Sequence, residues 1–287
     1  MENADHDDRS GVVRIGAAMT VAGRSVIVTG GGTGIGAACA RLLVENGASV
    51  TICGRTASRL EQVAESIGGP VHTVVADVTV EADVARIVSE AVSTFGGVHG
   101  FVANAGGGGS LNPYHRADAA DFMRVLQLNV MGTMLCIKHS VPELAKHRGS
   151  FVGMSSIAGH VTHLWFGAYP VAKAAIETMM RNAADEYGSV GVRFNSVRPG
   201  FITTEIMEGV PRDSSVYRSY LENTPMNGVG EPQDVAMLVR FLLSDESRWI
   251  TGQEIGVDGG HSLRRGPDFT EFTAPQAASL LRGEIVD

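Results

Sequence analysis

The sequence predicts an α/β fold, a doubly wound parallel sheet of about seven strands with helices on both faces. Short β-rich apolar runs alternate with amphipathic helical stretches along the chain. The first of these runs leads through a glycine-rich turn into a helix, and most of the later runs end in small or polar residues. We expect one large domain over residues 23–260, with an N-terminal arm at 1–22 and a C-terminal tail at 261–287.

Composition excludes several classes of function. The 287 residues are 44% hydrophobic and 19% charged, with a formal net charge of −8. The sequence has no cluster of Lys and Arg, and no apolar run approaches the roughly eighteen residues of a membrane span. The acidic N-terminus lacks the order of a secretory signal, and the three cysteines are isolated in apolar segments. We therefore expect a cytoplasmic protein that binds neither nucleic acid nor membrane.

The first strand, turn and helix carry the clearest local pattern. Residues 24–29 are β-rich and predict a buried strand, and the helix after the glycine turn ends at Asn46-Gly47. Glycines let the backbone approach a pyrophosphate, whose charge is favoured at a helix N-terminus. A phosphate-loop NTPase would need a Gly-Lys-Ser/Thr ending, which is absent. The predicted dinucleotide-binding turn contains Gly30, Gly32, Thr33, Gly34, Ile35 and Gly36.

The end of the second strand bears on which dinucleotide is bound. The run at 49–53 ends in Gly54 and Arg55. An acidic residue there would bind the ribose 2′-hydroxyl of NAD, whereas the guanidinium of Arg55 suits the 2′-phosphate of NADP. The alternative is a solvated Arg55 that opens the next helix. We favour NADP as the cofactor, with NAD as the alternative.

The remaining elements follow from the same two patterns. Amphipathic stretches predict helices at 58–67, 81–95, 118–139, 166–187 and 231–243. β-rich runs predict strands at 71–76, 99–103, 150–154, 192–197 and 254–257. The long connection at 201–230 has scattered apolar side chains and no clear element, which is typical of a lid or a disordered loop.

Polar or small residues interrupt the apolar pattern at three places. Asp77 ends one strand, where it either caps the next turn or contacts an adenine amine. Asn104, Ala105 and Gly106 end the following strand and would let a flat cofactor pass over it. Asn129 breaks an apolar helical stripe and is a poor helix former. Asn129 is either a satisfied core amide, which spacing alone favours, or the holder of a water in a proton relay.

The stretch from Ser156 to Lys173 holds three groups suited to proton transfer. Tyr169 lies thirteen residues after Ser156 and four before Lys173, so a helix would place the phenol and the ammonium on one face. Pro170 is tolerated only in a first turn, so this helix should begin near 166–168. An ammonium nearby lowers the pKa of a phenol, and a hydroxyl can hold a substrate oxygen. A Tyr-x-x-x-Lys pair also occurs by chance and gains weight only from the glycine turn upstream.

Two histidines within this stretch raise the question of a metal. His160 and His163 have no third candidate ligand close by in the sequence, so we expect no metal. We expect both side chains to line the wall of a pocket or its rim.

From about residue 24 to residue 260, the chain resembles the single-domain branch of the short-chain dehydrogenase/reductase family. The motifs that carry this resemblance are Thr29-Gly30-x-x-x-Gly34-Ile35-Gly36, Asp77, Asn104-Ala105-Gly106, Asn129, Ser156, Tyr169-x-x-x-Lys173 and Pro199-Gly200. In this order they are highly specific. The resemblance implies a Rossmann-fold enzyme that moves hydride between a nicotinamide and a carbonyl or alcohol carbon.

The resemblance also implies catalytic roles. The family residue that matches Tyr169 is the acid/base. The match of Lys173 lowers its pKa and holds the nicotinamide ribose. The match of Ser156 orients the substrate oxygen, and the match of Asn129 holds a water that relays protons to the lysine.

Cofactor contacts are implied in the same way. Asp77 and Val78 match residues that contact the adenine. The matches on the carboxamide and phosphate side of the cofactor are Ile202 and Thr204, after Pro199 and Gly200. The glycine turn lacks the basic residue of many NADP-preferring members, which weakens the NADP interpretation.

The resulting hypothesis is an NAD(P)(H)-dependent oxidoreductase that interconverts a secondary alcohol and a ketone. Apolar residues at 201–230 suggest an apolar substrate, steroid-like or fatty-acyl-like, unless they merely pack this segment onto the body. The alternative is a 3-oxoacyl thioester reductase, for which Arg212 and Arg218 are thin support. An enoyl-type reductase and a non-catalytic cofactor-binding protein rank lower, because the Tyr/Lys pair is intact. The resemblance implies a homo-oligomer, a tetramer or dimer, that packs through 118–139 and 166–187.

Overall fold

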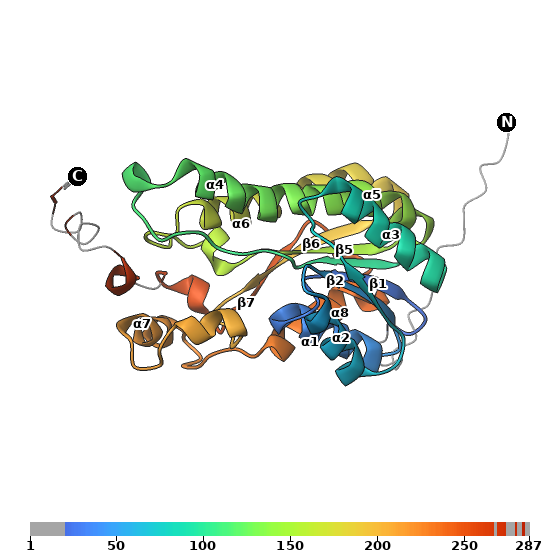
Figure 1. The fold of residues 1–287 in the computed structure, drawn as a ribbon, viewed down its shortest axis with the longest axis horizontal. Helices are drawn as coiled ribbons and strands as arrows, with labels where there is room; N and C mark the ends of the chain where they lie inside the picture. Colours follow the sequence, from blue (N-terminus) through green and yellow to red (C-terminus); the bar gives the residue numbers. More distant parts are fainter. Residues whose placement is uncertain (1–20, 267–268, 274–278, 280–282, 285–287) are drawn as a thin grey trace, which may run out of the picture.

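A seven-stranded parallel sheet lies between two layers of helices (Figure 1). The computed structural model describes residues 21–266, 269–273, 279 and 283–284, so residues 1–20 of the predicted arm lie outside it. The strands are β1 (Ser25–Thr29), β2 (Ser49–Gly54), β3 (Val71–Val75), β4 (Gly100–Ala103), β5 (Ser150–Met154), β6 (Arg193–Pro199) and β7 (Glu254–Val257). The helices are α1 (Gly34–Glu45), α2 (Ala57–Ile67), α3 (Glu81–Phe95), α4 (Ala119–Leu126), α5 (Gly132–Lys146), α6 (Ala168–Tyr187), α7 (Ser215–Asn223) and α8 (Pro232–Leu243). The predicted doubly wound sheet is confirmed.

The order of the strands creates a crevice at one edge of the sheet. The strands lie in the order β3-β2-β1-β4-β5-β6-β7, and all neighbours are parallel. The chain winds outward from β1 to β3 and then crosses to β4 on the other side of β1. Loops that leave β1 and β4 therefore diverge, and the carboxyl ends of these strands border the crevice in which such sheets bind ligands.

Each face of the sheet has its own apolar core. Helices α3, α5 and α6 cover one face, and α1, α2 and α8 cover the other (Figure 1). On the first face, the rings of Phe101, Phe151 and Phe194 stack across β4, β5 and β6 with centroids 5.1 and 5.3 Å apart. Because both faces are covered, every residue of β5 is buried. Burial of both faces explains why the central strands read as apolar runs rather than as an alternation.

The helix predicted at 118–139 contains a wide turn that the sequence pattern did not reveal. α4 is followed by a π-helical turn, Gln127–Met131, and α5 then continues to Lys146. The Thr133 hydroxyl donates to the Asn129 carbonyl at 2.7 Å within this turn. A π-turn accommodates extra chain inside an α-helix and is frequent at functional sites. None of the helices in the described part of the chain is long and apolar enough to cross a membrane.

The connection at 201–230 is more regular than predicted. It contains a 3₁₀ turn, Glu205–Gly209, and the nine-residue helix α7. α7 begins where the Ser214 hydroxyl accepts a hydrogen bond from the Tyr217 N–H at 3.1 Å, which is an N-cap. The prediction of an irregular segment is therefore wrong for this part.

A separate apolar group, which we call the lid cluster, holds α7 against the body. Its buried members are Trp165, Phe201, Val216, Tyr220 and Phe269. Tyr220 stacks on Phe201 with ring centroids 4.0 Å apart, and Phe269 meets Tyr220 edge-on at 6.0 Å. Part of the predicted tail thus packs on the segment that follows β6, and this long-range contact is what makes a short helix stable there.

Candidate active site

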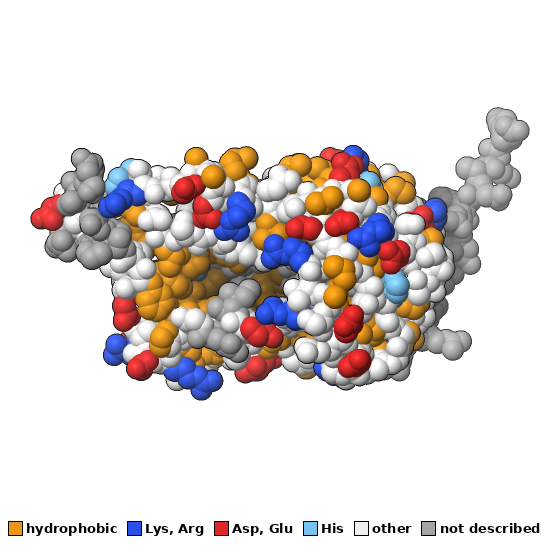
Figure 2. Space-filling model, viewed as in Figure 1, with side chains coloured by type: hydrophobic (Ala, Val, Ile, Leu, Met, Phe, Trp, Pro, Cys, Tyr) orange, Lys and Arg blue, Asp and Glu red, His pale blue; other side chains and the backbone are white. Residues whose placement is uncertain are grey.

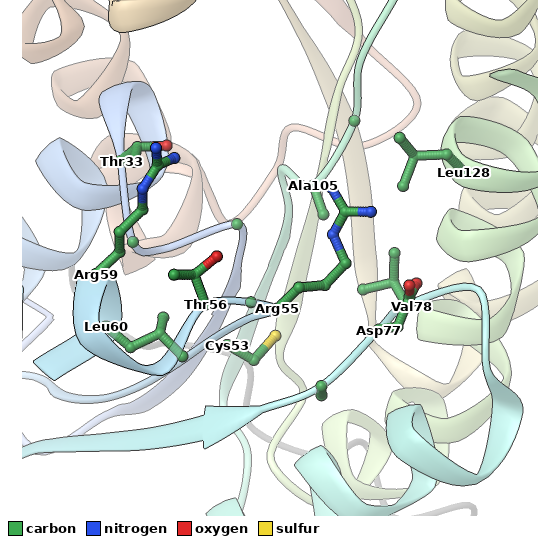
Figure 3. Close-up of a pocket in the computed structure, with 15 residues that line it drawn as sticks. Thr33, Cys53, Arg55, Thr56, Arg59, Leu60, Asp77, Val78, Ala105 and Leu128 are labelled. Atoms are coloured by element: carbon green, nitrogen blue, oxygen red, sulfur yellow. The ribbon is translucent and has the colours of Figure 1, made fainter.

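Two adjoining cavities open in the crevice at the carboxyl edge of the sheet. The smaller, about 200 Å³, lies beyond the ends of β2 and β3 (Figure 3). The larger, about 780 Å³, extends from the glycine turn to the lid cluster. On one face of the molecule, hydrophobic side chains gather in a hollow (Figure 2). The two cavities share Gly30, Thr33, Arg59, Ala105 and Gly106, so they form one cleft.

The glycine turn is locked to the end of β4. Thr29 Oγ1 accepts hydrogen bonds from the N–H groups of Asn104 and Ala105, both at 3.0 Å, and the Asn104 amide donates to the Thr29 carbonyl at 3.0 Å. A Cβ at Gly36 would lie 2.2 Å from the Gly30 carbonyl oxygen, so α1 can begin this close to the turn only with glycine there. No side chain caps the N-terminus of α1, which leaves its first N–H groups for an anion such as a pyrophosphate.

Two arginines line the smaller cavity, and one of them was not predicted. Arg55 follows β2, while Arg59 comes from the first turn of α2 (Figure 3). No described residue forms an ion pair or hydrogen bond with either guanidinium. The Arg59 guanidinium lies beside Thr33 and the Arg55 guanidinium beside Ala105, so each is placed to bind an anion such as a phosphate from its own side of the cavity (Figure 3). The sequence pattern places Arg59 on the solvated face of an amphipathic helix, so it did not indicate a binding role for this residue.

Asp77 caps the turn after β3. Its Oδ1 accepts hydrogen bonds from the Thr79 N–H at 2.9 Å and from the Thr79 hydroxyl at 2.8 Å. This is the first of the two roles that the sequence left open. Asp77 and Val78 also line the smaller cavity, so a contact to the adenine remains a prediction.

The π-turn brings Asn129 against the loop after β4. The Asn129 Nδ2 donates to the carbonyls of Gly107 and Val125, both at 2.9 Å, and its Oδ1 accepts the Gly107 N–H at 3.3 Å. A Cβ at Gly106 would lie 2.6 Å from Asn129 Oδ1 and 3.2 Å from Lys173 Nζ. The amide is thus a satisfied core group, as spacing alone favoured, and it lies beside the ammonium because position 106 has no side chain. A relay water at Asn129 remains a prediction.

Lys173 is a buried ammonium on the wall of the cleft. The residue is 4% exposed, and its Nζ donates to the Met154 carbonyl at 2.9 Å. Burial lowers the pKa of Lys173 from 10.5 to about 8, because a charge is disfavoured away from water. Lys173 therefore still carries its proton at neutral pH.

The environment of Tyr169 differs from the prediction. α6 begins one residue before Tyr169, as Pro170 indicated. Lys173 Nζ lies over the Tyr169 ring, 5.4 Å from its centroid. We expected the ammonium to lower the pKa of the phenol, but burial raises this pKa and a hydrogen bond from Ser156 opposes the rise. The ammonium does not lower the pKa of the phenol, because it faces the Tyr169 ring and donates to a backbone carbonyl. In this structure Tyr169 keeps its proton at neutral pH.

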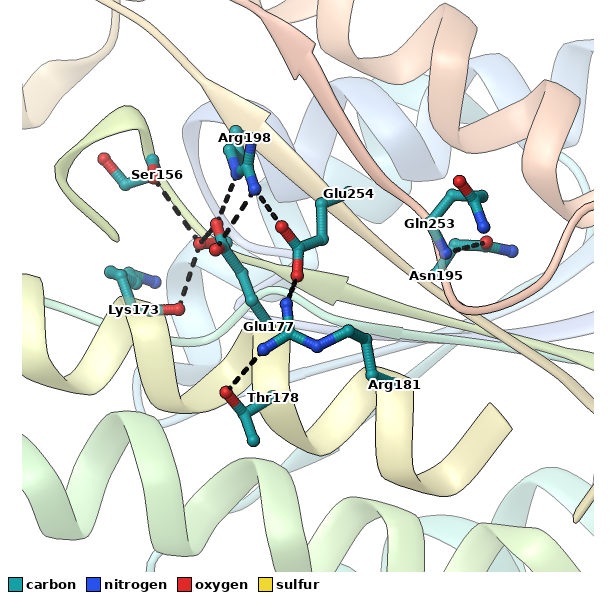
Figure 4. A network of polar contacts seen from close by, with 10 residues as sticks. Ser156, Lys173, Glu177, Thr178, Arg181, Asn195, Arg198, Gln253 and Glu254 are labelled. Carbon is teal, nitrogen blue, oxygen red and sulfur yellow. Dashed lines mark hydrogen bonds and ion pairs between the residues drawn. The ribbon is translucent and has the colours of Figure 1, made fainter. Parts of the chain in front are cut away.

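A buried ion-pair network fixes α6 one turn beyond Lys173 (Figure 4). Glu177 accepts hydrogen bonds from Arg198 Nε at 2.6 Å and from the Ser155 hydroxyl at 2.8 Å. Arg198 also pairs with Glu254 of β7. The network therefore ties the helix that carries Tyr169 and Lys173 to the end of β5, to β6 and to β7.

Most of the predicted site residues line the cleft. Those on the smaller cavity are Gly30, Gly32, Thr33, Arg55, Asp77, Val78, Ala105 and Gly106. Those found only on the larger cavity are Gly34, Ile35, Asn104, Ser156, Tyr169, Lys173, Pro199, Gly200, Ile202 and Thr204. Gly36 and Asn129 line neither cavity, since one packs under the glycine turn and the other lies behind Gly106.

The lid side of the larger cavity holds residues that were not predicted as site residues. They include Leu111, Phe166, Phe201 and Phe269. His163 faces this cavity as expected of a pocket wall, whereas His160 is exposed and lines neither cavity. The tail shows no periodicity, so no local signal marked Phe269. In the described part of the chain, no three His, Cys, Asp or Glu side chains are placed to hold a metal ion.

Known proteins are similar to this chain over most of its length. A family profile described as enoyl-(acyl carrier protein) reductase matches residues 30–262. A cis-4-hydroxycyclohexanecarboxylate dehydrogenase from Sinomonas cyclohexanicum is 36% identical over 243 residues, 83% of this chain and 96% of the relative. An L-fucose dehydrogenase from Bos taurus is 36% identical over 256 residues, 85% and 92% of the two chains. The solved structure of a short-chain type dehydrogenase/reductase from Mycobacterium ulcerans has a TM-score of 0.89 and 41% identity, and the match covers 93% of this chain and 100% of the other.

A methyl group at position 106 should destabilise the fold. Gly106→Ala places a Cβ within 2.6 Å of Asn129 Oδ1, so the loop or the amide must move. Overpacking of this kind costs about 1–3 kcal/mol of unfolding free energy, measurable by chemical denaturation. Gly188→Ala is the matched control, because a Cβ there meets nothing within 4 Å. Equal stability of both variants would contradict the crowding described above.

The buried ammonium should also appear in the pH dependence of stability. Folding lowers the pKa of Lys173 from 10.5 to about 8, so the unfolded chain binds the extra proton between these values and stability rises with pH there. Lys173→Met should be more stable than the wild type below pH 8, by on the order of 3 kcal/mol, and this advantage should shrink toward pH 10. Denaturation at several pH values checks this, with the exposed Lys146→Met as control. An advantage that is constant with pH would contradict it.

Proposed function

This chain belongs to the short-chain dehydrogenase/reductase family, and we propose that it is an NADP(H)-dependent enzyme that interconverts a secondary alcohol and a ketone. The similarity to known proteins confirms the family that the motifs indicated. The observation that carries the proposal is the grouping of Ser156, Tyr169 and Lys173 on one wall of the larger cavity, next to the glycine turn. A proton donor or acceptor, a hydroxyl and a cation are the groups that this reaction requires.

The roles of these residues follow from their chemistry. When bound, the nicotinamide supplies hydride to the reacting carbon or accepts it. Tyr169 gives its proton to the ketone oxygen in reduction and takes one from the alcohol in oxidation. Ser156 holds the same oxygen, and its hydrogen bond to Tyr169 favours the phenolate that forms when Tyr169 gives up its proton. Lys173 would hold the nicotinamide ribose, as the family resemblance implies. The raised pKa of Tyr169 supports its role as proton donor in reduction, since the phenol is protonated at neutral pH.

The residues of the cleft suit NADP. The first N–H groups of α1 and the glycine turn would hold the pyrophosphate. Arg55 and Arg59 would hold the 2′-phosphate, and the end of β2 offers a glycine where NAD-specific sites place an acidic residue. Arg59 strengthens the NADP interpretation, because it supplies a second cation from α2 when the glycine turn has none.

The substrate side of the cleft supports a largely apolar molecule. The lid cluster contributes Phe201, Tyr220 and Phe269 to the wall of a cavity of about 780 Å³. One relative is named for a hydroxylated cyclohexanecarboxylate and another for a sugar, and both of these molecules are ring alcohols. We place a ring or chain of this general size, with a secondary alcohol or ketone, in the cavity. A homo-oligomer that packs through α4, α5 and α6 is part of the same proposal.

A thioester substrate is the second candidate. The matching profile is described by an acyl carrier protein substrate, which favours an acyl chain in the larger cavity. A 3-oxoacyl group fits the proton-transfer residues as well as a simple ketone does. The enoyl reaction has less support, because Tyr169 and Lys173 keep the spacing that suits a carbonyl oxygen.

Loss of the Tyr169 hydroxyl should abolish turnover and leave cofactor binding intact. We expect Tyr169→Phe to lower kcat by about 10²–10⁴, the usual contribution of a general acid or base. The assay is a panel of secondary alcohols, ketones and 3-oxoacyl thioesters with both nucleotides, and NADPH fluorescence reports binding. Turnover by the variant near the wild-type rate would refute the role of Tyr169.

The two arginines should set the preference for NADPH over NADH. Arg55→Ala and Arg59→Ala should each raise the KM for NADPH about 10- to 100-fold, since a hydrogen bond to a charged group contributes about 1.5–3 kcal/mol. The KM for NADH should change little. Arg41→Ala is the control, because Arg41 bonds to Ser66 and lines neither cavity. A wild-type enzyme that prefers NADH, or variants that alter both KM values alike, would overturn the assignment.

A further inference from the structure

His163 brings an imidazole ring to the wall of the larger cavity, on the side of the lid cluster. The residue is 8% exposed and lies between Ser156 and the start of α6. The Phe166 ring meets it edge-on with centroids 5.3 Å apart, and Phe269 in turn meets Phe166 edge-on at 4.6 Å. His163 therefore lines only the larger cavity, on the side formed by the lid cluster, whereas Arg55 lines only the smaller one.

The hydrogen bonds of the ring determine which nitrogen carries the proton. Nδ1 of His163 lies 2.8 Å from the Val161 carbonyl oxygen, and a carbonyl can only accept, so Nδ1 must be the donor. The chain closes over this edge, since a Cβ at Gly266 would lie 3.1 Å from Nδ1. Nε2 then has a lone pair, and none of the described residues donates a hydrogen bond to it. Nε2 is not one of the fully buried side-chain atoms without a partner, so the wall offers an accessible hydrogen-bond acceptor amid apolar side chains.

Burial keeps this acceptor neutral. It lowers the pKa of His163 from 6.5 to about 4, the Val161 carbonyl opposes this change, and the nearby His261 adds to the lowering. A neutral Nε2 attracts an O–H group. It does not attract a carboxylate, because both groups present lone pairs. A ligand that covers Nε2 without donating to it leaves a buried polar atom unsatisfied.

We propose that His163 determines substrate specificity by accepting a hydrogen bond from a second hydroxyl group of the substrate. The preferred substrates are then alcohols or ketones that carry a further hydroxyl on an apolar ring or chain. One oxygen lies at Tyr169 and the second at His163. A carboxylate in the second position is disfavoured. This inference rests on the proposed function, since it needs the reacting oxygen to lie at Tyr169.

The test compares ring alcohols that differ only in the second substituent. The probes are the cyclohexane-1,3-diols and 1,4-diols, 4-methylcyclohexanol and 4-hydroxycyclohexanecarboxylate, each oxidised with NADP⁺. For the wild type we expect kcat/KM to be at least tenfold higher for the better diol than for 4-methylcyclohexanol, and lowest for the carboxylate. His163→Leu should remove the preference for the diol, mainly through KM, by lowering kcat/KM for the diol far more than kcat/KM for 4-methylcyclohexanol.

Two further variants separate this role from a structural one. His163→Gln keeps an acceptor oxygen and should retain part of the diol preference. His160→Leu carries the same change as His163→Leu on an exposed side chain outside both cavities, so it should retain all of the preference. NADPH fluorescence shows that each variant still binds the nucleotide.

The possible outcomes distinguish this inference from the proposed function. A wild type that oxidises 4-methylcyclohexanol and the diols equally well overturns the role of His163 and leaves the proposed function standing. The role of His163 is also overturned if His163→Leu and His163→Gln keep the full diol preference, or if both variants lower kcat/KM equally for all of the alcohols. The proposed function stands in these cases. If the wild type oxidises none of these ring alcohols, the proposed function fails for this class and the inference falls with it.

Discussion

The site is arranged around the buried ammonium of Lys173. A charge removed from water destabilises the folded chain unless nearby groups compensate it. Part of this compensation comes from the Met154 carbonyl at the end of β5. Gly106 has no side chain, so the Asn129 amide can lie beside the ammonium, and the π-turn positions that amide. The pair of Glu177 and Arg198 fixes the next turn of the same helix. Several distant parts of the chain thus hold one cation at the wall of the cleft.

The two ends of the cleft are built by different physical means. On the nucleotide side, backbone geometry dominates. The Thr29 hydroxyl joins β1 to β4, and glycines allow contacts too close for any Cβ. On the substrate side, large side chains of the lid cluster form the wall by packing on one another. Ser156 and Tyr169 line the larger cavity, which reaches from the glycine turn to the lid cluster.

Most of the fold and the polar half of the site could be predicted from the sequence because their signals are local. Strands buried on both faces read as apolar runs, and the glycine turn lies directly between its strand and its helix. The π-turn around Asn129 left no trace, because one wide turn hardly shifts an apolar stripe. Helix α7 was missed because it depends on contacts with Phe201 and Phe269, which are not its sequence neighbours. The predicted direction of the Tyr169 pKa shift was wrong. The spacing of the two residues places the ammonium on the same helix face as the phenol, but it does not determine the atom to which the ammonium donates.

Phe269 shows that one wall of the cavity is built separately from the sheet. It lies beyond the last strand, outside every element that shapes the sheet or the glycine turn, yet it lines the larger cavity. Phe269 belongs to the lid cluster and to neither core of the sheet, so a mutation at this residue should alter the shape of the cavity and leave the parallel core in place. Substrate range can therefore diverge between related enzymes through changes near the C-terminus, while the machinery for dinucleotide and proton is inherited intact.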